Sequence, residues 1–312
     1  MDRVSRFCSK FSAFFQASQC SRIWLLLFAS PLLLGLGGCL KHTRLIERPQ
    51  KPPIVLSSGA GQLIQGLDER YDTIHTMSAT VLMRASVGGA SKGKVTDYTS
   101  LRGYIRLRQP DMLRVLGLLP VIETRAFDMV SNGKNFTLLI PPKSEAITGS
   151  GVVTTPSANA LMNLRPAVFY DSLLVGKIGA SDFIYVTTDT RIAPIPHSKH
   201  LIEEPDYELG VLRRQGDSQE LLPERVIHIS RTNLLPYQQD EYDDHGILVT
   251  RTLYSDYKMF DQIQYPTEIT ISRPIDGYKI ELTIQKLTFN HPLPDDQFVL
   301  KIPAGTKIQQ LP

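Results

Sequence analysis

The chain has 312 residues, a formal net charge of +3, and apolar side chains at 42% of its positions. Residues 1–38 carry four basic residues and one acidic residue, so they account for the whole excess charge, and residues 39–312 carry 30 charges of each sign. A protein that binds nucleic acid needs clustered basic side chains to neutralise phosphates. A neutral chain with interspersed charges lacks that pattern, so we expect no nucleic-acid partner.

The N-terminal segment has the layout of a secretory signal. Four basic residues, the last of them Arg22, precede an uncharged run at 23–40, as a basic region precedes the apolar region of a signal peptide. A membrane-spanning helix needs about 20 apolar residues, and this run is interrupted by Pro31 and several glycines. We therefore expect residues 1–38 to be a signal peptide that is removed; an uncleaved membrane anchor is the alternative.

The end of that run, Leu36-Gly37-Gly38-Cys39, resembles the lipobox of bacterial lipoproteins. The resemblance implies that Cys39 carries a covalent diacylglycerol and an N-acyl chain after cleavage, which anchor the protein stably because each buried CH₂ contributes about 0.8 kcal/mol. Cys8 and Cys20 would be removed with the signal, so no disulfide is expected. Leu40 follows the cysteine, which by the habit of lipoproteins implies the outer membrane, with the protein facing the periplasm.

Residues 39–60 are rich in proline, serine and glycine, including Pro49, Pro52 and Pro53. Such a composition predicts a flexible tether. Residues 61–312 are then long enough for one large β domain.

Periodicity changes along this domain. The segment Gln62–Thr76 has apolar residues at helical spacing, whereas Ser78–Val87 alternates between apolar and polar side chains as a strand with one wet face does. Leu101–Pro110 continues the alternation and carries a row of arginines at 102, 106 and 108. We interpret this row as a solvated outer face; binding of anionic headgroups is the alternative.

Turn signals divide the remaining chain into short strands. Asn132-Gly133 predicts a hairpin because both residues accept positive φ. In the C-terminal half, the predicted strands are 226–231, 247–257, 267–273 and 278–289, with turns at 243–246, 264–266 and 274–277. The apolar phase slips near Gln285-Lys286, which predicts a β-bulge. Closely spaced turns indicate an antiparallel meander.

A strongly apolar segment, 155–177, separates the two halves. Thr155 with Pro156, and then Pro166, are typical helix starts. We expect two short helices whose apolar side chains form a lid or a permanent part of the core: Leu161, Met162, Leu164, Val168 and Phe169.

This order of helix, strands, helical insert and strands resembles the lipoprotein-localisation (Lol) carriers, with the ending from Asn290 to Asp295, then Phe298 and Pro303, most similar in style. The resemblance covers roughly residues 61–312. It implies a mainly β (α+β) fold: a strongly curved antiparallel incomplete β-barrel with an N-terminal helix and a short helical insert as its lid. It also implies an apolar concave face that takes up acyl chains.

The stretch 116–122 combines several apolar residues with Gly117 and Pro120, which disfavour a continuous strand. Leu116, Leu118 and Leu119 are therefore candidates for a protruding apolar loop that meets the bilayer, as in the membrane-bound Lol acceptor. A buried strand end is the alternative.

Patterns for metal binding and catalysis are weak. His197, His200, Glu203 and Glu204 lie in a stretch that we expect to be a surface loop, without the spacing of a helical zinc pair. The acidic run 240–244 is expected at a solvated hairpin tip, and His228 in an ordinary strand. No Gly-x-Ser-x-Gly motif is present.

The sequence thus favours a monomeric, non-enzymatic envelope lipoprotein that binds a lipid or lipoprotein cargo through its acyl chains, without a metal or a further cofactor. It would meet the membrane through its lipid anchor and could receive cargo from a periplasmic partner protein. The alternative is a scaffold lipoprotein of an envelope complex.

Overall fold

The computed structural model describes residues 43–89, 93–151, 165–195, 198–216 and 218–311. The chain from Pro49 onward forms a unit separate from the residues before it. The predicted signal peptide and the lipobox residues Leu36 to Cys39 lie outside the described residues.

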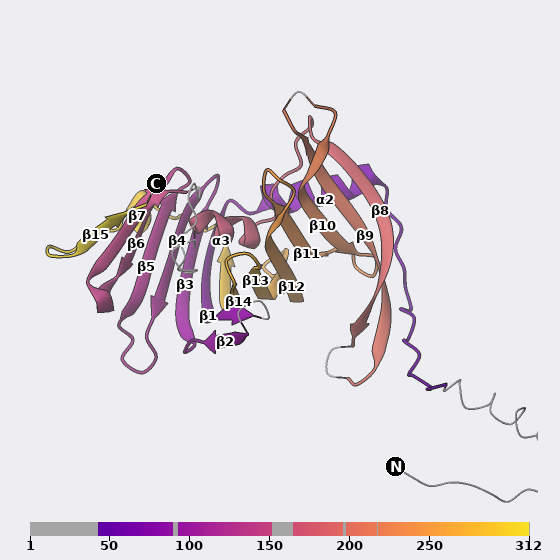
Figure 1. Cartoon of the computed structure of the whole chain (residues 1–312), viewed down its shortest axis with the longest axis horizontal. Coiled ribbons are helices and arrows are strands. Elements are labelled where there is room, and N and C mark those ends of the chain that lie inside the picture. Colours follow the sequence, from indigo (N-terminus) through magenta and orange to yellow (C-terminus); the bar gives the residue numbers. More distant parts are fainter. Residues whose placement is uncertain (1–42, 90–92, 152–164, 196–197, 217, 312) are drawn as a thin grey trace, which may run out of the picture. The chain divides into compact units, whose positions relative to one another are not determined.

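One sheet of 15 strands dominates the unit (Figure 1), in the order β15-β7-β6-β5-β4-β3-β1-β14-β13-β12-β11-β10-β9-β8, with β2 paired to β1. All pairings are antiparallel except that of β15 with β7. The first strands are β1 (Thr76–Gly89), β2 (Lys94–Asp97), β3 (Leu101–Arg108), β4 (Met112–Leu118), β5 (Arg125–Asn132), β6 (Asn135–Ile140) and β7 (Glu145–Ser150). The remaining strands are β8 (Phe183–Pro194), β9 (Leu201–Arg214), β10 (Leu221–Ser230), β11 (Pro236–Tyr242), β12 (Leu248–Phe260), β13 (Ile263–Arg273), β14 (Tyr278–Phe289) and β15 (Lys307–Gln310).

The sheet curves without closing. Its two ends are β8 and β15, which do not pair with each other. Two meanders, β1 to β7 and β8 to β14, meet where β1 pairs with β14. The predicted fold class, a curved and incomplete antiparallel barrel with few helices, is confirmed.

Alternation along the strands builds the core. On β1, Met77, Ala79, Val81 and Met83 are buried while the residues between them reach solvent in part. The same pattern on β3, β4 and β14 gives the concave side an apolar lining.

Two helices each cover a different part of this lining. Helix α2 (Ala60–Thr73) buries Leu63 and Leu67 against residues of β9 and β10 such as Leu209 and Ile227. Helix α3 (Pro166–Leu173) begins with proline at its first turn and buries Phe169 and Leu173 in the larger cluster, which extends over β1, β3 to β7 and β12 to β14. Short 3₁₀ turns lie at Pro141–Lys143 (η3) and Asp295–Phe298 (η5). Within the described ranges, no helix is long and apolar enough to cross a membrane.

Several local predictions are confirmed. Gly133 turns the β5–β6 hairpin with a φ of 83°, and the helix predicted at Gln62–Thr76 corresponds to α2. The bulge is also present, because Thr80 pairs with Lys286 and Val81 pairs with Ile284, so Gln285 is the extra residue. Of the two helices predicted in the insert, the one beginning at Pro166 is α3; the one beginning at Pro156, with Leu161, Met162 and Leu164, lies outside the described residues.

Three local predictions were wrong. Gln264-Tyr265-Pro266 is not a turn but part of β13, and the chain reverses between β12 and β13 at Asp261 and Gln262. The surface loop expected to hold His197, His200, Glu203 and Glu204 is shorter than predicted, because His200 is exposed and precedes β9, whereas Glu203 and Glu204 lie in β9. Asp240 and Glu241 lie in β11 rather than at a hairpin tip, which holds only Asp243 and Asp244.

Part of the predicted tether is tied to the sheet. Gln50 forms a parallel bridge with Ile202, its N–H donating to the Leu201 carbonyl at 2.8 Å. Arg231 donates to the Leu56 carbonyl at 3.0 Å, and the Ser58 N–H donates to the Tyr207 hydroxyl at 2.8 Å. The body therefore begins near Gln50, before α2.

The convex side contains one fully buried carboxylate. Arg114 on β4 donates two hydrogen bonds to Asp128 on β5, at 2.9 and 2.7 Å, and the Asp128 side chain is 0% exposed. Replacing one partner of such a pair leaves the other charge uncompensated.

We expect Asp128→Ala to lower the free energy of unfolding by about 3–5 kcal/mol in urea denaturation, because Arg114 would remain largely buried without its counter-ion. Asp295→Ala removes the partner of Arg108 in an ion pair whose carboxylate is 87% exposed, and it should cost less than about 1 kcal/mol. Equal effects of the two substitutions would contradict this assignment.

Candidate functional site

Three hollows follow one another along α2. The α3 pocket, about 400 Å³, lies between α3 and the turns at the ends of β3, β5 and β7. The tyrosine pocket, about 50 Å³, lies between α2, the end of α3 and strands β12 and β13. The α2 pocket, about 430 Å³, lies on the far side of Leu67 and Arg70 near the β12–β13 turn.

Shared lining residues show that these hollows are neighbours in one line. Tyr71 and Leu174 line both the α3 pocket and the tyrosine pocket. Leu67, Arg70 and Ile263 line both the tyrosine pocket and the α2 pocket. The line is therefore wide at both ends and narrow in the middle.

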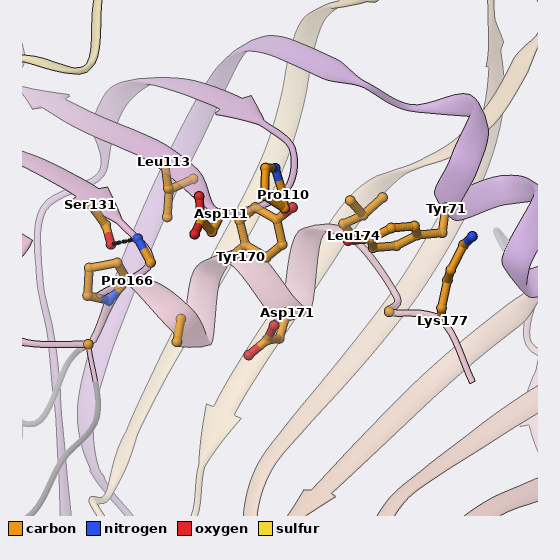
Figure 2. Close-up of a pocket in the computed structure, with 14 residues that line it drawn as sticks. Tyr71, Pro110, Asp111, Leu113, Ser131, Pro166, Tyr170, Asp171, Leu174 and Lys177 are labelled. Atoms are coloured by element: carbon orange, nitrogen blue, oxygen red, sulfur yellow. Dashed lines mark hydrogen bonds between the residues drawn. The ribbon is translucent and has the colours of Figure 1, made fainter. Parts of the chain in front are cut away.

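The α3 pocket combines apolar walls with a few polar groups (Figure 2). Leu113, Pro166, Leu174 and Tyr71 supply apolar surface, and Asp111, Asp171 and Lys177 supply charge. Lys177 pairs with Asp72 at 2.6 Å between its Nζ and the Oδ2 of the carboxylate. Sites of about 300–1,000 Å³ with mostly apolar walls and few polar groups are the common form of small-molecule sites.

Tyrosines form the narrow middle of the line. The Tyr257 hydroxyl donates to the Pro236 carbonyl and the Tyr265 hydroxyl to the Leu173 carbonyl, each at 2.6 Å. The buried Tyr254 hydroxyl has no hydrogen-bond partner among the described residues. Burial raises the pKa of all three side chains, so each hydroxyl is neutral and able to donate.

Polar contacts hold the end of α3 against β10 and β11. Arg225 donates to the carbonyls of Gly176 and Lys177, both at 2.9 Å. Gln239 donates to the Asp171 carbonyl at 3.3 Å and to Glu241 at 2.8 Å. Desolvation, and then the charge of Glu241, raise the pKa of the Asp171 carboxyl to about 7, and Arg225 acts in the opposite direction.

The predicted site residues are only partly brought together. Val168 and Phe169 pack inward from α3 against the sheet, 8% and 2% exposed. Leu116 and Leu118 lie on β4 rather than in a loop, and Leu119 directly follows that strand. The loop at 119–124 exposes Val121 and Ile122 instead, 98% and 65% exposed.

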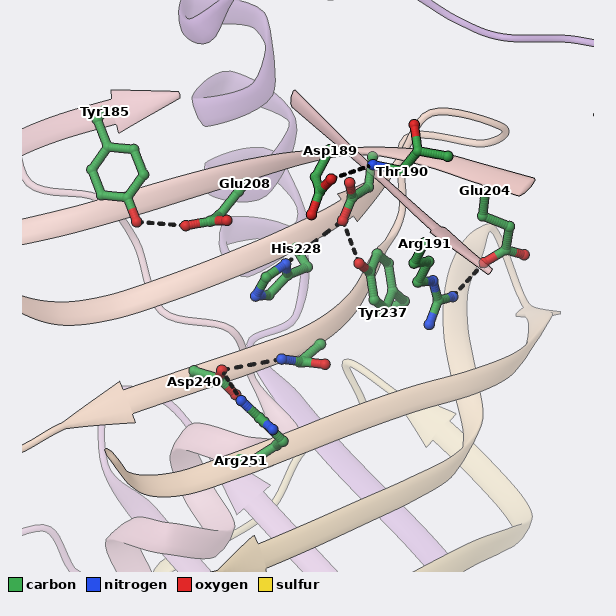
Figure 3. A network of polar contacts seen from close by, with 12 residues as sticks. Tyr185, Asp189, Thr190, Arg191, Glu204, Glu208, His228, Tyr237, Asp240 and Arg251 are labelled. Carbon is green, nitrogen blue, oxygen red and sulfur yellow. Dashed lines mark hydrogen bonds and ion pairs between the residues drawn. The ribbon is translucent and has the colours of Figure 1, made fainter. Parts of the chain in front are cut away.

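The residues weighed for metal binding or catalysis have other partners. His228 lies in β10 with its Nδ1 3.6 Å from Asp206, and Arg251 donates to both oxygens of the buried Asp240 (Figure 3). His197 lies outside the described residues. Among those that are described, no group of three or more His, Cys, Asp or Glu side chains could hold a metal ion.

Sequence reasoning missed the tyrosine pocket and Asp171. Tyr71 belonged to the apolar face of a predicted helix and Tyr254 to a predicted strand, so neither residue was singled out as part of a site. The signal available was the number of tyrosines on core faces, because a buried hydroxyl needs a partner.

Comparisons with known proteins give few matches in sequence. A family model described as "Uncharacterized protein" matches residues 203–301. No curated protein matches the chain.

Solved structures with a similar fold include a LolA superfamily protein from Nitrosomonas europaea, at 15% identity, a TM-score of 0.48, and coverage of 78% of this chain and 99% of that one. A DUF1329 family protein from Desulfovibrio piger matches at 17% identity and a TM-score of 0.47, covering 76% and 95%. A domain provisionally named for outer membrane lipoprotein sorting, from Vibrio parahaemolyticus, matches at 14% identity and a TM-score of 0.47. The match covers 76% of this chain and 94% of that one. Each of these three structures is similar to this chain at low identity and at a TM-score below 0.5.

The raised pKa of Asp171 makes a testable contribution to stability. A carboxyl whose pKa is higher in the folded than in the unfolded chain destabilises the fold as pH rises from about 4 through 7. Asp171→Asn should therefore raise the melting temperature relative to the unchanged chain at pH 8, and the gain should shrink toward pH 4. A difference that stays constant between these pH values would contradict the assignment.

Proposed function

We propose that this protein is a lipid-anchored, non-enzymatic carrier or acceptor that takes up an acyl chain of a lipid or lipoprotein in the line of hollows beneath α2. The anchor would be attached at Cys39, and the protein would face the periplasm from the outer membrane. The observation that carries the proposal is the adjacency of the three hollows, since a long flexible ligand can extend over neighbouring hollows once the residues shared by their walls move aside.

Energetics agree with reversible uptake. An acyl chain of about 16 carbons gains roughly 12 kcal/mol when buried, at about 0.8 kcal/mol per CH₂. Association costs an estimated 4–15 kcal/mol. A modest net affinity suits a carrier, because the cargo must also be released.

The narrow tyrosine pocket requires a conformational change when an acyl chain is taken up. A hollow of about 50 Å³ does not hold a hydrocarbon chain, so Tyr254, Tyr257 or the helices above them must shift on uptake. The unpartnered Tyr254 hydroxyl would then meet the ester or amide carbonyl of the ligand, since an unsatisfied buried donor costs about 1–3 kcal/mol.

The loop at 119–124 is the candidate contact with the bilayer. Its ends are hydrogen-bonded, with the Leu119 N–H donating to the Thr124 carbonyl at 2.8 Å. At its tip Val121 has a φ of 71°, a strained conformation for a β-branched residue. An ordered loop that exposes Val121 and Ile122 is suited to insert apolar side chains between headgroups.

Filling the α3 pocket should prevent uptake. Ala167 is exposed and lines this pocket, so Ala167→Trp adds bulk there without touching the buried Val168 and Phe169. We expect native mass spectrometry of the full chain carrying Cys39→Ser to show co-purifying lipid, and Ala167→Trp to lower the lipid-bound fraction about tenfold.

Ala60→Trp is the matched control, because Ala60 is exposed at the start of α2 and lines none of the three hollows. It should keep the bound lipid. If no lipid accompanies the unchanged chain, or if both variants lose it equally, the carrier function is refuted and the scaffold function is favoured.

The loop can be tested separately from the hollows. Val121→Glu with Ile122→Glu should slow transfer of a fluorescent phospholipid from the protein to phosphatidylcholine vesicles by about tenfold or more, because a carboxylate resists insertion. Loading and melting temperature should not change. Ile275→Glu, at a residue 60% exposed in the β13–β14 turn, is the control; a similar slowing there would show that the loop has no special part.

A further inference from the structure

A separate hollow of about 350 Å³ lies on the outer face of β3, β1 and β14, opposite the core. Its polar lining comes from two cross-strand rows. One row is Arg106, Ser78 and Thr288, and the other is Tyr104, Thr80 and Lys286. We call this hollow, which these six polar residues line, the outer hollow.

The β-bulge at Gln285 gives Lys286 its place. Before the bulge Ile284 is buried, and after it Leu287 is buried, so Gln285 and Lys286 are both exposed. Bulges commonly redirect a side chain in this way. Here the result is an ammonium group on the same face as Arg106, with β1 between them.

Arg106 differs from the other arginines of this face. Arg84 donates to the Ser100 hydroxyl at 3.1 Å, Arg102 pairs with Glu123 at 2.8 Å, and Arg108 pairs with Asp295 at 2.6 Å. Arg114, directly across from Arg106, is paired with Asp128. In the part of the chain that the structure describes, the side chains of Arg106 and Lys286 have no ion pair and no hydrogen bond.

The outer hollow offers donors without a competing carboxylate. Besides the guanidinium and the ammonium, four hydroxyls line it, and no acidic residue does. Two cations with several hydroxyls match a tetrahedral oxyanion of charge −1 to −2, because each oxygen can accept more than one hydrogen bond. A carboxylate would leave part of these donors unused.

Its rim is fixed by the C-terminal segment. Arg108 donates to the Leu293 carbonyl at 2.7 Å and Arg114 to the Gln297 carbonyl at 2.9 Å, so Leu293 and Gln297 are held where they close one side. The side-chain oxygen of Gln297 is buried without a partner among the described residues. If the side-chain amide of Gln297 is rotated by about 180°, so that its oxygen and nitrogen exchange places, its NH₂ becomes a further donor toward the hollow.

We propose that the outer hollow binds a phosphoryl group, with Arg106 and Lys286 neutralising its charge and the hydroxyls of Ser78, Thr80 and Tyr104 donating to its oxygens. The group can belong to free phosphate or to a phospholipid headgroup. The proposal does not depend on acyl-chain uptake, because it concerns the opposite face of the sheet.

The test is calorimetric titration of the full chain in a non-ionic detergent with two probes, inorganic phosphate and dihexanoyl-phosphatidylglycerol. The variant is Arg106→Gln with Lys286→Gln. The matched control is Arg102→Gln with Lys279→Gln, which removes the same charge from the same two strands, at residues paired with Glu123 and Glu281.

We expect saturable binding by the unchanged chain and the control, and affinity at least about tenfold weaker in the Arg106/Lys286 variant. If the Arg106/Lys286 variant binds inorganic phosphate more weakly than the unchanged chain does, the site accepts phosphate itself. If only its binding of the phosphatidylglycerol is weakened, the site accepts a phospholipid headgroup. No saturable binding of either probe, or equal weakening in variant and control, would overturn the proposal. All substituted side chains lie on the outer face, so melting temperatures should agree between the two variants.

Discussion

An antiparallel sheet that does not close leaves an apolar face that its own strands cannot cover. In this protein the face extends across strands on both sides of the β1–β14 pairing, whereas the helices that cover it have 14 and 8 residues. Each helix buries its own cluster, α2 with β9 and β10, and α3 with the strands around β1 and β14. The tyrosine pocket lies between these two clusters, because Leu67 of one cluster and Tyr254 of the other both line it. A groove beneath the helices is thus a consequence of the architecture and does not require a special motif.

The pairing of β1 with β14 determines how both faces are composed. Along β1, alternation directs Met77, Ala79 and Val81 inward and Ser78 and Thr80 outward. A slip of one residue would exchange these sets, so the register is strongly specified. The extra residue Gln285 changes the phase of β14 without disturbing β1, and it keeps Leu287 in the core while Lys286 remains outside. One local irregularity therefore serves both the packing and the charge of the outer face.

Alternation also explains which parts of the fold could be predicted from the sequence. The strands β1, β3 and β14 have one buried face, so apolar residues recur at every second position. Strand β8 forms the edge of the sheet and is exposed at most positions, so it has no such pattern and was not predicted as a strand. Pro266 was taken for a turn, but β13 pairs with β14 only from Glu268 onward; the proline lies where the strand has one neighbour and its missing N–H is not needed.

The candidate sites were harder to predict because they depend on contacts between distant segments. Tyr71, Leu174 and Tyr254 come from α2, the end of α3 and β12, and no periodicity indicates that they meet. The arginine row was visible in the sequence, yet its members differ in their partners. Glu123 from the loop after β4 neutralises Arg102, and Asp295 of η5 neutralises Arg108, whereas Arg106 has no ion pair and no hydrogen bond among the described residues. The sequence shows where the charges are, and the tertiary contacts decide which of them is available.

The two proposed sites lie on opposite faces of one sheet, which restricts what they can hold together. A phospholipid whose chain lay beneath α2 could not place its phosphate in the outer hollow without passing through the sheet. The acyl chain and the phosphoryl group must therefore belong to different molecules. In the proposed function, cargo would enter from the concave side, where Tyr254 and the α3 pocket lie, while the outer hollow would contact a second anion.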